Sequence, residues 1–205
     1  MSKLMIFLNG NIGSGKNEVA SYLSSRYGFS QYAFGEKIRE GLYALNPYLK
    51  VDGFIRGSTV REEVNALGWD RAKREIPEIR RLLQVFGTEA GREIHGENAW
   101  AKLVNATMNP CNDSRPAVVS DLRFPSEFEY FKGRYSAWSK FLLQIIHITK
   151  PDVTNQEVHV SESMDVEAEF PGYVRELSND GNIKDLHAKV DAILFQLVFN
   201  QIVAK

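Results

Sequence analysis

Cysteine is almost missing from this chain of 205 residues, which contains only Cys111. A single cysteine cannot form a disulfide within the chain, and it cannot supply the several thiolates of a cysteine-based zinc site. Both kinds of protein are therefore excluded. The composition is typical of a reducing compartment, and we expect a cytoplasmic location.

The sequence also lacks net charge, long apolar runs and internal repeats. Lysine and arginine number 25, aspartate and glutamate 26, and the formal net charge is −1. Balanced charge gives no overall attraction to nucleic acid or to an anionic membrane, so we expect neither as a partner. The first apolar run, residues 4–8, is too short for a signal segment or a membrane span. The length and the 43% hydrophobic content fit a single domain over residues 1–205.

A glycine-rich segment follows that first apolar run. It has the pattern glycine, four residues, glycine, lysine, and it comprises Gly10, Asn11, Ile12, Gly13, Ser14, Gly15 and Lys16. Glycine lets successive backbone N–H groups face one concavity, and the expected helix at 17–27 directs its positive dipole end there. The alternative is an ordinary turn between a strand and a helix. We predict a phosphate-binding loop in which Lys16 contacts the β- and γ-phosphates of a nucleoside triphosphate.

Two residues are candidates for holding a magnesium ion. Asn17 occupies the position after the lysine, where a Ser or Thr hydroxyl usually ligates Mg²⁺, and an amide oxygen can replace it directly or through water. Asp121 ends the apolar segment 116–121, where phosphate-loop enzymes place an acid that holds the metal. Asp121 could instead cap the next helix. Arg123 could reach a phosphate from the same edge.

Apolar patterning predicts alternating strands and helices, and hence a three-layer α/β fold with a parallel central sheet and ligands at the carboxyl ends of its strands. We expect strands at 4–8, 29–34, 116–121, 141–148 and 173–177, and helices at 17–27, 35–45, 59–68, 77–86, 97–108 and 183–203. Residues 35–108 then form a mostly helical insertion. Within it, 48–57 resembles an irregular connection, Thr59 and Glu62 are expected to form a capping box, and Gly87 is expected to end a helix.

Arginines of the insertion are candidates for binding a phosphorylated acceptor. Arg39 lies one turn into its expected helix, where it could hold a phosphate or else remain a solvated residue beside Glu36 and Glu40. Seven arginines lie from Arg56 to Arg92 inclusive, and most of them are expected to be surface charges paired with nearby Glu. Arg92 is the best single candidate among them.

Three neighbours of Arg92 could recognise a base. Gln84 and Glu89 could read a base edge, and Trp100 could stack on a base. The helical spacing of Trp100 makes a core position the alternative. Residues 150–172 hold six acids and no arginine, and they could form a lid-like flap or a solvated loop.

In their order along the chain, these segments resemble deoxynucleoside monophosphate kinases of tailed bacteriophages. The resemblance rests on Gly-Ser-Gly-Lys-Asn at 13–17, Leu-Gln-Val-Phe-Gly-Thr-Glu-Ala-Gly-Arg at 83–92 with Trp100 downstream, Ser-Asp-Leu-Arg-Phe-Pro-Ser-Glu at 120–127, His-Val-Ser-Glu at 159–162 and Ser-Asn-Asp-Gly at 178–181. It implies a P-loop NTPase fold of the nucleoside monophosphate kinase type. It also implies that ATP phosphorylates a deoxynucleoside monophosphate with Mg²⁺, and that Asn179 and Gly181 lie near the adenine.

The same resemblance implies a division of roles. Lys16, Asp121, Arg92 and Arg123 would be catalytic, and the segment 35–39 is similar to the start of the acceptor-site helix in this group. Two features depart from the family pattern: Asn17 replaces Asp, Ser or Thr, and the flap lacks the arginines of adenylate-kinase-like lids. Transition-state cations would then come from Arg123, Arg92 or another arginine of the insertion.

Other functions stay open on the sequence alone. A kinase of another small phosphorylated metabolite, such as dephospho-coenzyme A or phosphomevalonate, would share the core, and so would a nucleotide switch or assembly ATPase. A GTPase switch would carry Asn-Lys-x-Asp, which the sequence lacks. We expect small-molecule substrates and leave a homodimer open. A viral enzyme would act in the cytoplasm of an infected bacterial host.

Overall fold

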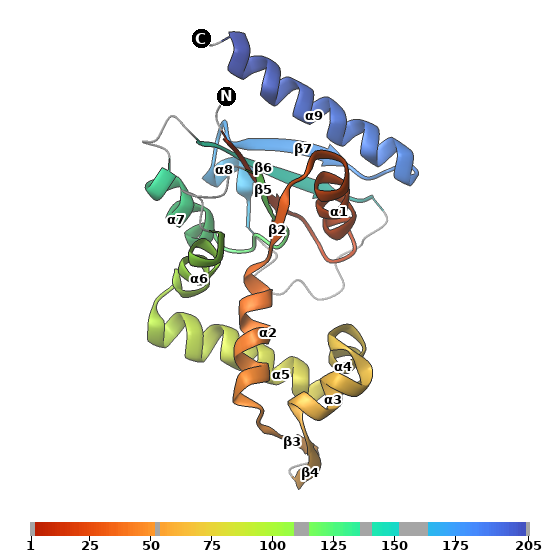
Figure 1. The fold of residues 1–205 in the computed structure, drawn as a ribbon, viewed down its shortest axis with the longest axis vertical. Coiled ribbons are helices and arrows are strands. Elements are labelled where there is room, and N and C mark those ends of the chain that lie inside the picture. Colours follow the sequence, from red (N-terminus) through yellow and green to blue (C-terminus); the bar gives the residue numbers. More distant parts are fainter. Residues whose placement is uncertain (1–2, 52–53, 109–114, 136–140, 152–163, 204–205) are drawn as a thin grey trace. The chain divides into compact units, whose positions relative to one another are not determined.

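The computed structural model describes residues 3–51, 54–108, 115–135, 141–151 and 164–203 (Figure 1). Cys111 and most of the expected flap, including residues 159–162, lie outside these ranges. The chain divides into two compact units, one formed by Met1–Ala33 with Asn105–Lys205 and the other by Phe34–Val104. Across the described ranges, no helix is both long enough and apolar enough to cross a membrane.

The first unit is built on five parallel strands, ordered β2-β5-β1-β6-β7. Their bounds are Lys3–Asn9 for β1, Ser30–Tyr32 for β2, Ala117–Val119 for β5, Phe141–Thr149 for β6 and Val174–Ser178 for β7. Phe7 of the central strand pairs in register with Val119 on one side and Ile145 on the other. The expected parallel sheet is confirmed.

Helices cover both faces of this sheet because alternate residues of β1 are buried on opposite sides. Leu4, Ile6 and Leu8 share a core with α1 (Lys16–Tyr27) and α9 (Ile183–Val203). Phe7 packs against Phe128 of α7 (Pro125–Tyr135), with ring centroids 5.2 Å apart, and Phe128 in turn contacts Phe170 just after α8 (Val166–Glu169). The three-layer α/β fold is therefore confirmed.

The second unit is mostly helical. It contains α2 (Phe34–Leu45), β3 (Tyr48–Val51), β4 (Phe54–Thr59), α3 (Val60–Leu67), α4 (Trp69–Glu75), α5 (Pro77–Val85), the π-helix η1 (Phe86–Ile94) and the start of α6 (Ala99–Met108). Thr59 and Glu62 form a capping box, in which each side chain accepts a hydrogen bond from the backbone N–H of the other.

Two local expectations are wrong. The described part of 48–57 is not irregular, because β3 and β4 form an antiparallel pair in which Leu49 is fully buried between the exposed Tyr48 and Lys50. Gly87 does not end a helix, because α5 continues directly into η1. A Cβ at Gly87 would lie 3.0 Å from the Ile38 side chain, so this glycine allows close helix packing rather than a turn.

Candidate functional site

The loop between β1 and α1 has the backbone that the glycine pattern predicts. Gly10, Gly13 and Gly15 have φ angles of 138°, 81° and 106°, a region that other residues rarely adopt. A Cβ on Gly10 would lie 2.3 Å from the carbonyl oxygen of Ile148, whereas a Cβ on Gly13 would meet nothing within 4 Å. The loop therefore packs against the end of β6 on one side and is open at Gly13.

Lys16 begins α1 and reaches back across this loop. Its ammonium group donates hydrogen bonds to the carbonyl oxygens of Gly10, at 2.6 Å, and Asn11, at 2.8 Å. A cation next to a glycine-rich loop at a helix N-terminus creates a site that attracts phosphate oxygens. The local geometry therefore suits a polyphosphate.

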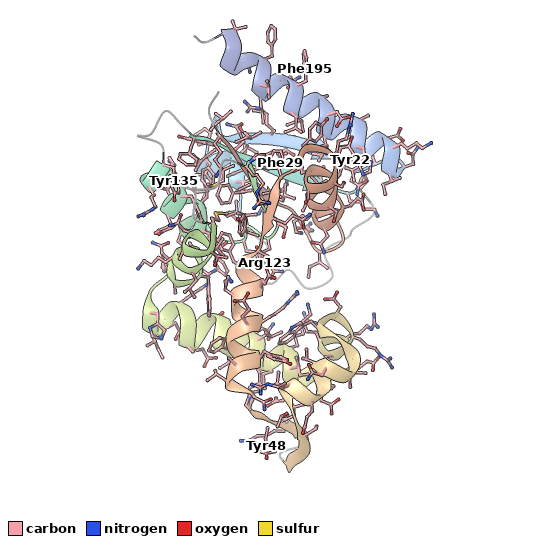
Figure 2. The ribbon with its side chains drawn as sticks, viewed as in Figure 1. Tyr22, Phe29, Tyr48, Arg123, Tyr135 and Phe195 are labelled. Carbon is pink, nitrogen blue, oxygen red and sulfur yellow. The ribbon has the colours of Figure 1, made fainter. Side chains whose placement is uncertain are left out.

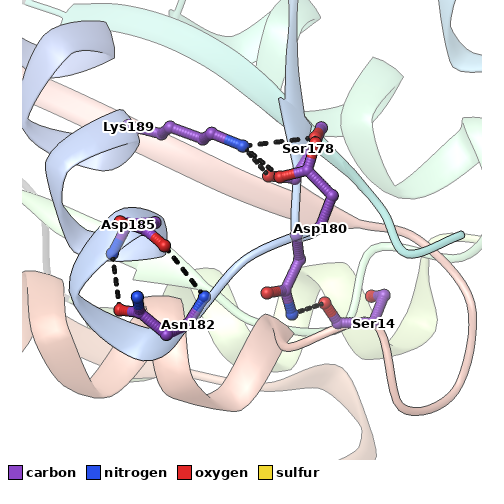
Figure 3. A network of polar contacts seen from close by, with 7 residues as sticks. Ser14, Ser178, Asp180, Asn182, Asp185 and Lys189 are labelled. Atoms are coloured by element: carbon purple, nitrogen blue, oxygen red, sulfur yellow. Dashed lines mark hydrogen bonds and ion pairs between the residues drawn. The ribbon is translucent and has the colours of Figure 1, made fainter.

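The segment after β7 is joined to the same loop (Figure 3). Asn179 donates from its side-chain amide to the carbonyl oxygen of Ser14 at 2.8 Å. Gly15 makes this approach possible, because a Cβ there would lie 2.7 Å from the Asn179 amide nitrogen. Asn179 was expected near the adenine, and its side chain is used to hold the loop.

An ion pair with α9 also holds the segment that follows β7. Lys189 of α9 donates to the carboxylate of Asp180, and also to the carbonyl oxygen of Ser178 at 2.9 Å (Figure 3). The Lys189 ammonium and the Ser178 hydroxyl together lower the pKa of Asp180 to about 2. Gly181 is exposed, and a Cβ there would lie 2.6 Å from a carboxylate oxygen of Asp185.

The turn after β5 carries Asp121 and Arg123 at the carboxyl edge of the sheet. Asp121 is half-buried, and Arg123 is exposed (Figure 2). Glu127 is 2% exposed, and its carboxylate accepts hydrogen bonds from the backbone N–H groups of Arg123, at 3.0 Å, and Phe124, at 3.1 Å. The capping role considered for Asp121 is thus performed by Glu127, which sequence reasoning did not single out.

The metal candidates are both oxygen donors. Asn17 is exposed in the first turn of α1, in the same unit as Asp121. No cluster of three or more His, Cys, Asp or Glu side chains that could hold a metal occurs among the described residues. Amide and carboxylate oxygens are hard ligands of the kind Mg²⁺ takes, while soft metals prefer thiolates.

In the second unit, Arg39 lines a hollow of about 430 Å³. The other lining residues are Glu36, Glu40, Tyr43, Val64, Asn65 and Trp69. Among the contacts described for this unit, Glu40 pairs with Lys37, and Arg39 forms no ion pair. The Tyr43 hydroxyl donates to the Asn65 side-chain oxygen at 2.7 Å.

Sequence reasoning missed Tyr43, Asn65 and Trp69 in this hollow. The ring centroids of Tyr43 and Trp69 lie 6.5 Å apart, so the hollow offers two aromatic surfaces. A signal for Tyr43 was present, because a residue four positions after Arg39 lies on the same face of a helix. Asn65 and Trp69 come from other helices, and no local pattern indicates them.

The remaining acceptor candidates do not line this hollow. Trp100 is 5% exposed and donates its indole N–H to the carbonyl oxygen of Gly87, so it occupies the core position weighed as its alternative. Gln84 and Glu89 are exposed, and Arg92 donates to the carbonyl oxygen of Glu97 at 3.1 Å. Base stacking by Trp100 is therefore corrected to a structural role.

Comparison with known proteins gives a family and several similar folds. Residues 73–190 match the family model described as deoxynucleotide monophosphate kinase. A provisionally named deoxynucleotide monophosphate kinase of Acanthamoeba polyphaga mimivirus is 27% identical over 176 residues, or 78% of this chain and 80% of that protein. The chain is also similar to a dephospho-CoA kinase from Campylobacter jejuni, with 13% identity, 96% and 98% coverage and a TM-score of 0.49. A gluconokinase from Sinorhizobium meliloti 1021 aligns at 12% identity, 98% and 97% coverage and a TM-score of 0.46.

Proposed function

Because the chain belongs to the deoxynucleotide monophosphate kinase family, we propose that it transfers the γ-phosphate of ATP to deoxynucleoside monophosphates and so supplies DNA precursors. The chain is a phosphotransferase of the nucleoside monophosphate kinase type, and the family match covers more than half of it. The observation that carries the proposal is the loop from Gly10 to Lys16, with its positive φ angles and its lysine held across the loop. In phosphoryl transfer the protein mainly positions the substrates and stabilises charge.

On the donor side, backbone N–H groups of residues 10–16 and the ammonium of Lys16 would bind the phosphates of ATP. Asn179 holds the loop through Ser14, and the backbone near Gly181 would then face the adenine. Mg²⁺ would be held by Asp121 and Asn17 together with ATP. When bound, it neutralises charge on the phosphate oxygens.

Arginines would supply the positive charges that bind the acceptor phosphate and stabilise the transferring phosphoryl group. Arg123 is exposed at the carboxyl edge of the sheet and would stabilise the transferring phosphoryl group, with Arg92 as a second candidate. Arg39 would hold the acceptor phosphate, since it lines a hollow and forms no ion pair within the described contacts. Gln84 and Glu89 remain proposed readers of the base. We propose that the insertion as a whole binds the acceptor, and that residues 150–172 act as a lid.

A homodimer is part of the proposal. Phe195 and Phe199 of α9 are 72% and 53% exposed, and their stacked rings lie 6.0 Å apart. Figure 2 labels Phe195 on this helix. Residues 192–203 carry no charge, so two copies could associate without like-charge repulsion. Sedimentation of the wild type and of Phe195→Ser tests this proposal. We still predict that the enzyme acts in the cytoplasm, that it comes from a tailed phage and that it does not bind nucleic acid.

An assay of ADP release tests the function. The enzyme would be offered ATP with each of the four common deoxynucleoside monophosphates, their ribose forms, 5-hydroxymethyl-dCMP, dephospho-coenzyme A and phosphomevalonate. We expect ADP release to depend strictly on an added deoxynucleoside monophosphate. Hydrolysis without any monophosphate would instead support a switch or ATPase. Transfer only to dephospho-coenzyme A or phosphomevalonate would support the other kinase class.

A further inference from the structure

The carboxyl ends of three neighbouring strands are connected by side chains as well as by the sheet. Asn9, the last residue of β1, is 8% exposed and donates its side-chain N–H to the carbonyl oxygen of Leu122 at 3.0 Å. On its other side it pairs in register with His147 of β6, whose Nδ1 lies 2.6 Å from the Asn9 Oδ1 atom. Asn9 therefore bridges β6 and the turn after β5.

These contacts determine which nitrogen of His147 carries its proton. The Asn9 amide nitrogen donates to Leu122, so its Oδ1 atom is the acceptor that faces His147. An acceptor requires a donor opposite, and Nδ1 of His147 must carry a hydrogen. Without that donor, the buried Oδ1 atom would lose its partner and the amide would lose one of the two bonds that orient it.

The bridge completes the support of the turn that carries Asp121 and Arg123. Leu122 donates its N–H to the carbonyl oxygen of Leu8 at 3.0 Å, and its own carbonyl accepts from Asn9. The Glu127 carboxylate accepts hydrogen bonds from the backbone N–H groups of Arg123 and Phe124, the two residues after Leu122. The backbone between Asp121 and Arg123 is thus held from β1 on one side and from α7 on the other.

We propose that His147 is a positioning residue for phosphoryl transfer, acting through Asn9 on the turn of Asp121 and Arg123. The inference rests on the proposed function, because that function assigns these two side chains to the metal and the phosphoryl group. In this proposal His147 acts through Asn9 and not by contact with the substrate. Its loss would let the Asn9 amide rotate and the turn shift, and catalysis is sensitive to displacements of this kind.

Two substitutions of His147 separate positioning from a direct role. The amide nitrogen of asparagine stands as many bonds from Cα as Nδ1 of histidine, and that of glutamine as many as Nε2. We expect His147→Asn to keep kcat within about threefold of the wild type, because it retains the donor to Asn9. We expect His147→Gln to lower kcat about tenfold and to raise the Mg²⁺ requirement, with the KM values for ATP and acceptor little changed.

A double-mutant cycle checks the route through Asn9. Asn9→Ala combined with His147→Gln should lower kcat no further than the more damaging single change, since both break one connection. A greater loss in His147→Asn than in His147→Gln would assign the function to Nε2 and overturn the proposal, and an equal loss in both would overturn it as well. Unchanged kcat in both would also overturn it, and so would thermal destabilisation without a change in kcat.

Nitrogen NMR of the histidine ring gives a result that does not depend on kinase activity. We expect His147 as the Nδ1–H tautomer in the wild type, and an Nε2–H tautomer would overturn the inference. A wild type that transfers no phosphate to any monophosphate would refute the proposed function instead. The two failures are therefore distinguishable.

Discussion

Trp100 donates its indole N–H to the carbonyl oxygen of Gly87 at 2.8 Å, and its ring occupies the space over Gly91. A Cβ at Gly91 would lie 2.3 Å from a carbon of that ring. We expect Gly91→Ala to reduce the free energy of unfolding by about 1–3 kcal/mol, because the ring would have to leave a close-packed position. Chemical denaturation measures this change.

Gly133 of α7 provides the matched control. A Cβ there would meet nothing within 4 Å, so Gly133→Ala should stabilise the protein by about 0.5–1 kcal/mol through helix propensity. Equal effects of the two substitutions would show that Trp100 is not packed against Gly91.

Lys16→Met should lower kcat at least about 100-fold, because methionine keeps the apolar stem but loses the charge that we propose stabilises the transferring phosphoryl group. Steady-state ADP release measures kcat, and circular dichroism verifies the fold. Lys102→Met removes an exposed lysine of α6 and should leave kcat unchanged. Near-normal turnover in folded Lys16→Met would refute a phosphate-binding role for the loop.

Arg39→Ala should raise the KM for the acceptor about 30-fold, which corresponds to about 2 kcal/mol for a lost charge-assisted pair of hydrogen bonds. The KM for ATP should stay close to normal. Arg39→Lys should recover part of the loss, because it restores the charge without the planar fork. Arg74→Ala removes an exposed arginine of the same unit as a control. An unchanged acceptor KM in Arg39→Ala would make Arg39 a surface residue.

Asp121→Asn should impair catalysis far more than Asn17→Ala, since a carboxylate is the stronger Mg²⁺ ligand of the two. Titration of Mg²⁺ against rate for both variants compares them directly. We expect Asp121→Asn to shift the titration to higher Mg²⁺. The reverse order would make Asn17 the main protein ligand.

The Asp180–Lys189 pair should stabilise the fold in a pH-dependent way. The pKa of Asp180 falls from 3.8 to about 2, mainly because Lys189 and Ser178 bond its charged form. A lowered pKa in the folded state means that the contribution is present above pH 3.8 and is lost as the pH falls toward about 2. The difference in melting temperature between wild type and Asp180→Asn should therefore shrink across this interval. A difference in melting temperature that does not change with pH would contradict the proposed contribution of the Asp180–Lys189 pair.

Short-range patterns allowed much of the first unit to be predicted. The glycine spacing around Gly10 and Lys16 requires a particular backbone whatever surrounds it, and the apolar periods of β1 and α1 lie within one window of sequence. The capping box at Thr59 is equally local, because its two partners stand three residues apart. These features were confirmed.

The second unit was harder to predict because contacts distant in sequence override local preference there. Gly87 was expected to end a helix, yet Ile38 packs against it and the helix continues. Leu49 lies in the core of the unit, and its burial supports a hairpin where the sequence suggested a loop. The Asp52-Gly53 pair was a hairpin signal that the prediction passed over.

By itself, the sequence determined the backbone of the glycine-rich loop at 10–16, the parallel α/β core and the family resemblance, because each depends on residues close together or on an ordered set of motifs. Only the tertiary structure decided how side chains from separate segments combine. Asn9 meets Leu122 and His147, and Asn179 meets Ser14, across more than 100 residues in each case. No local pattern encodes such partners, since they become neighbours only when the strands align in register.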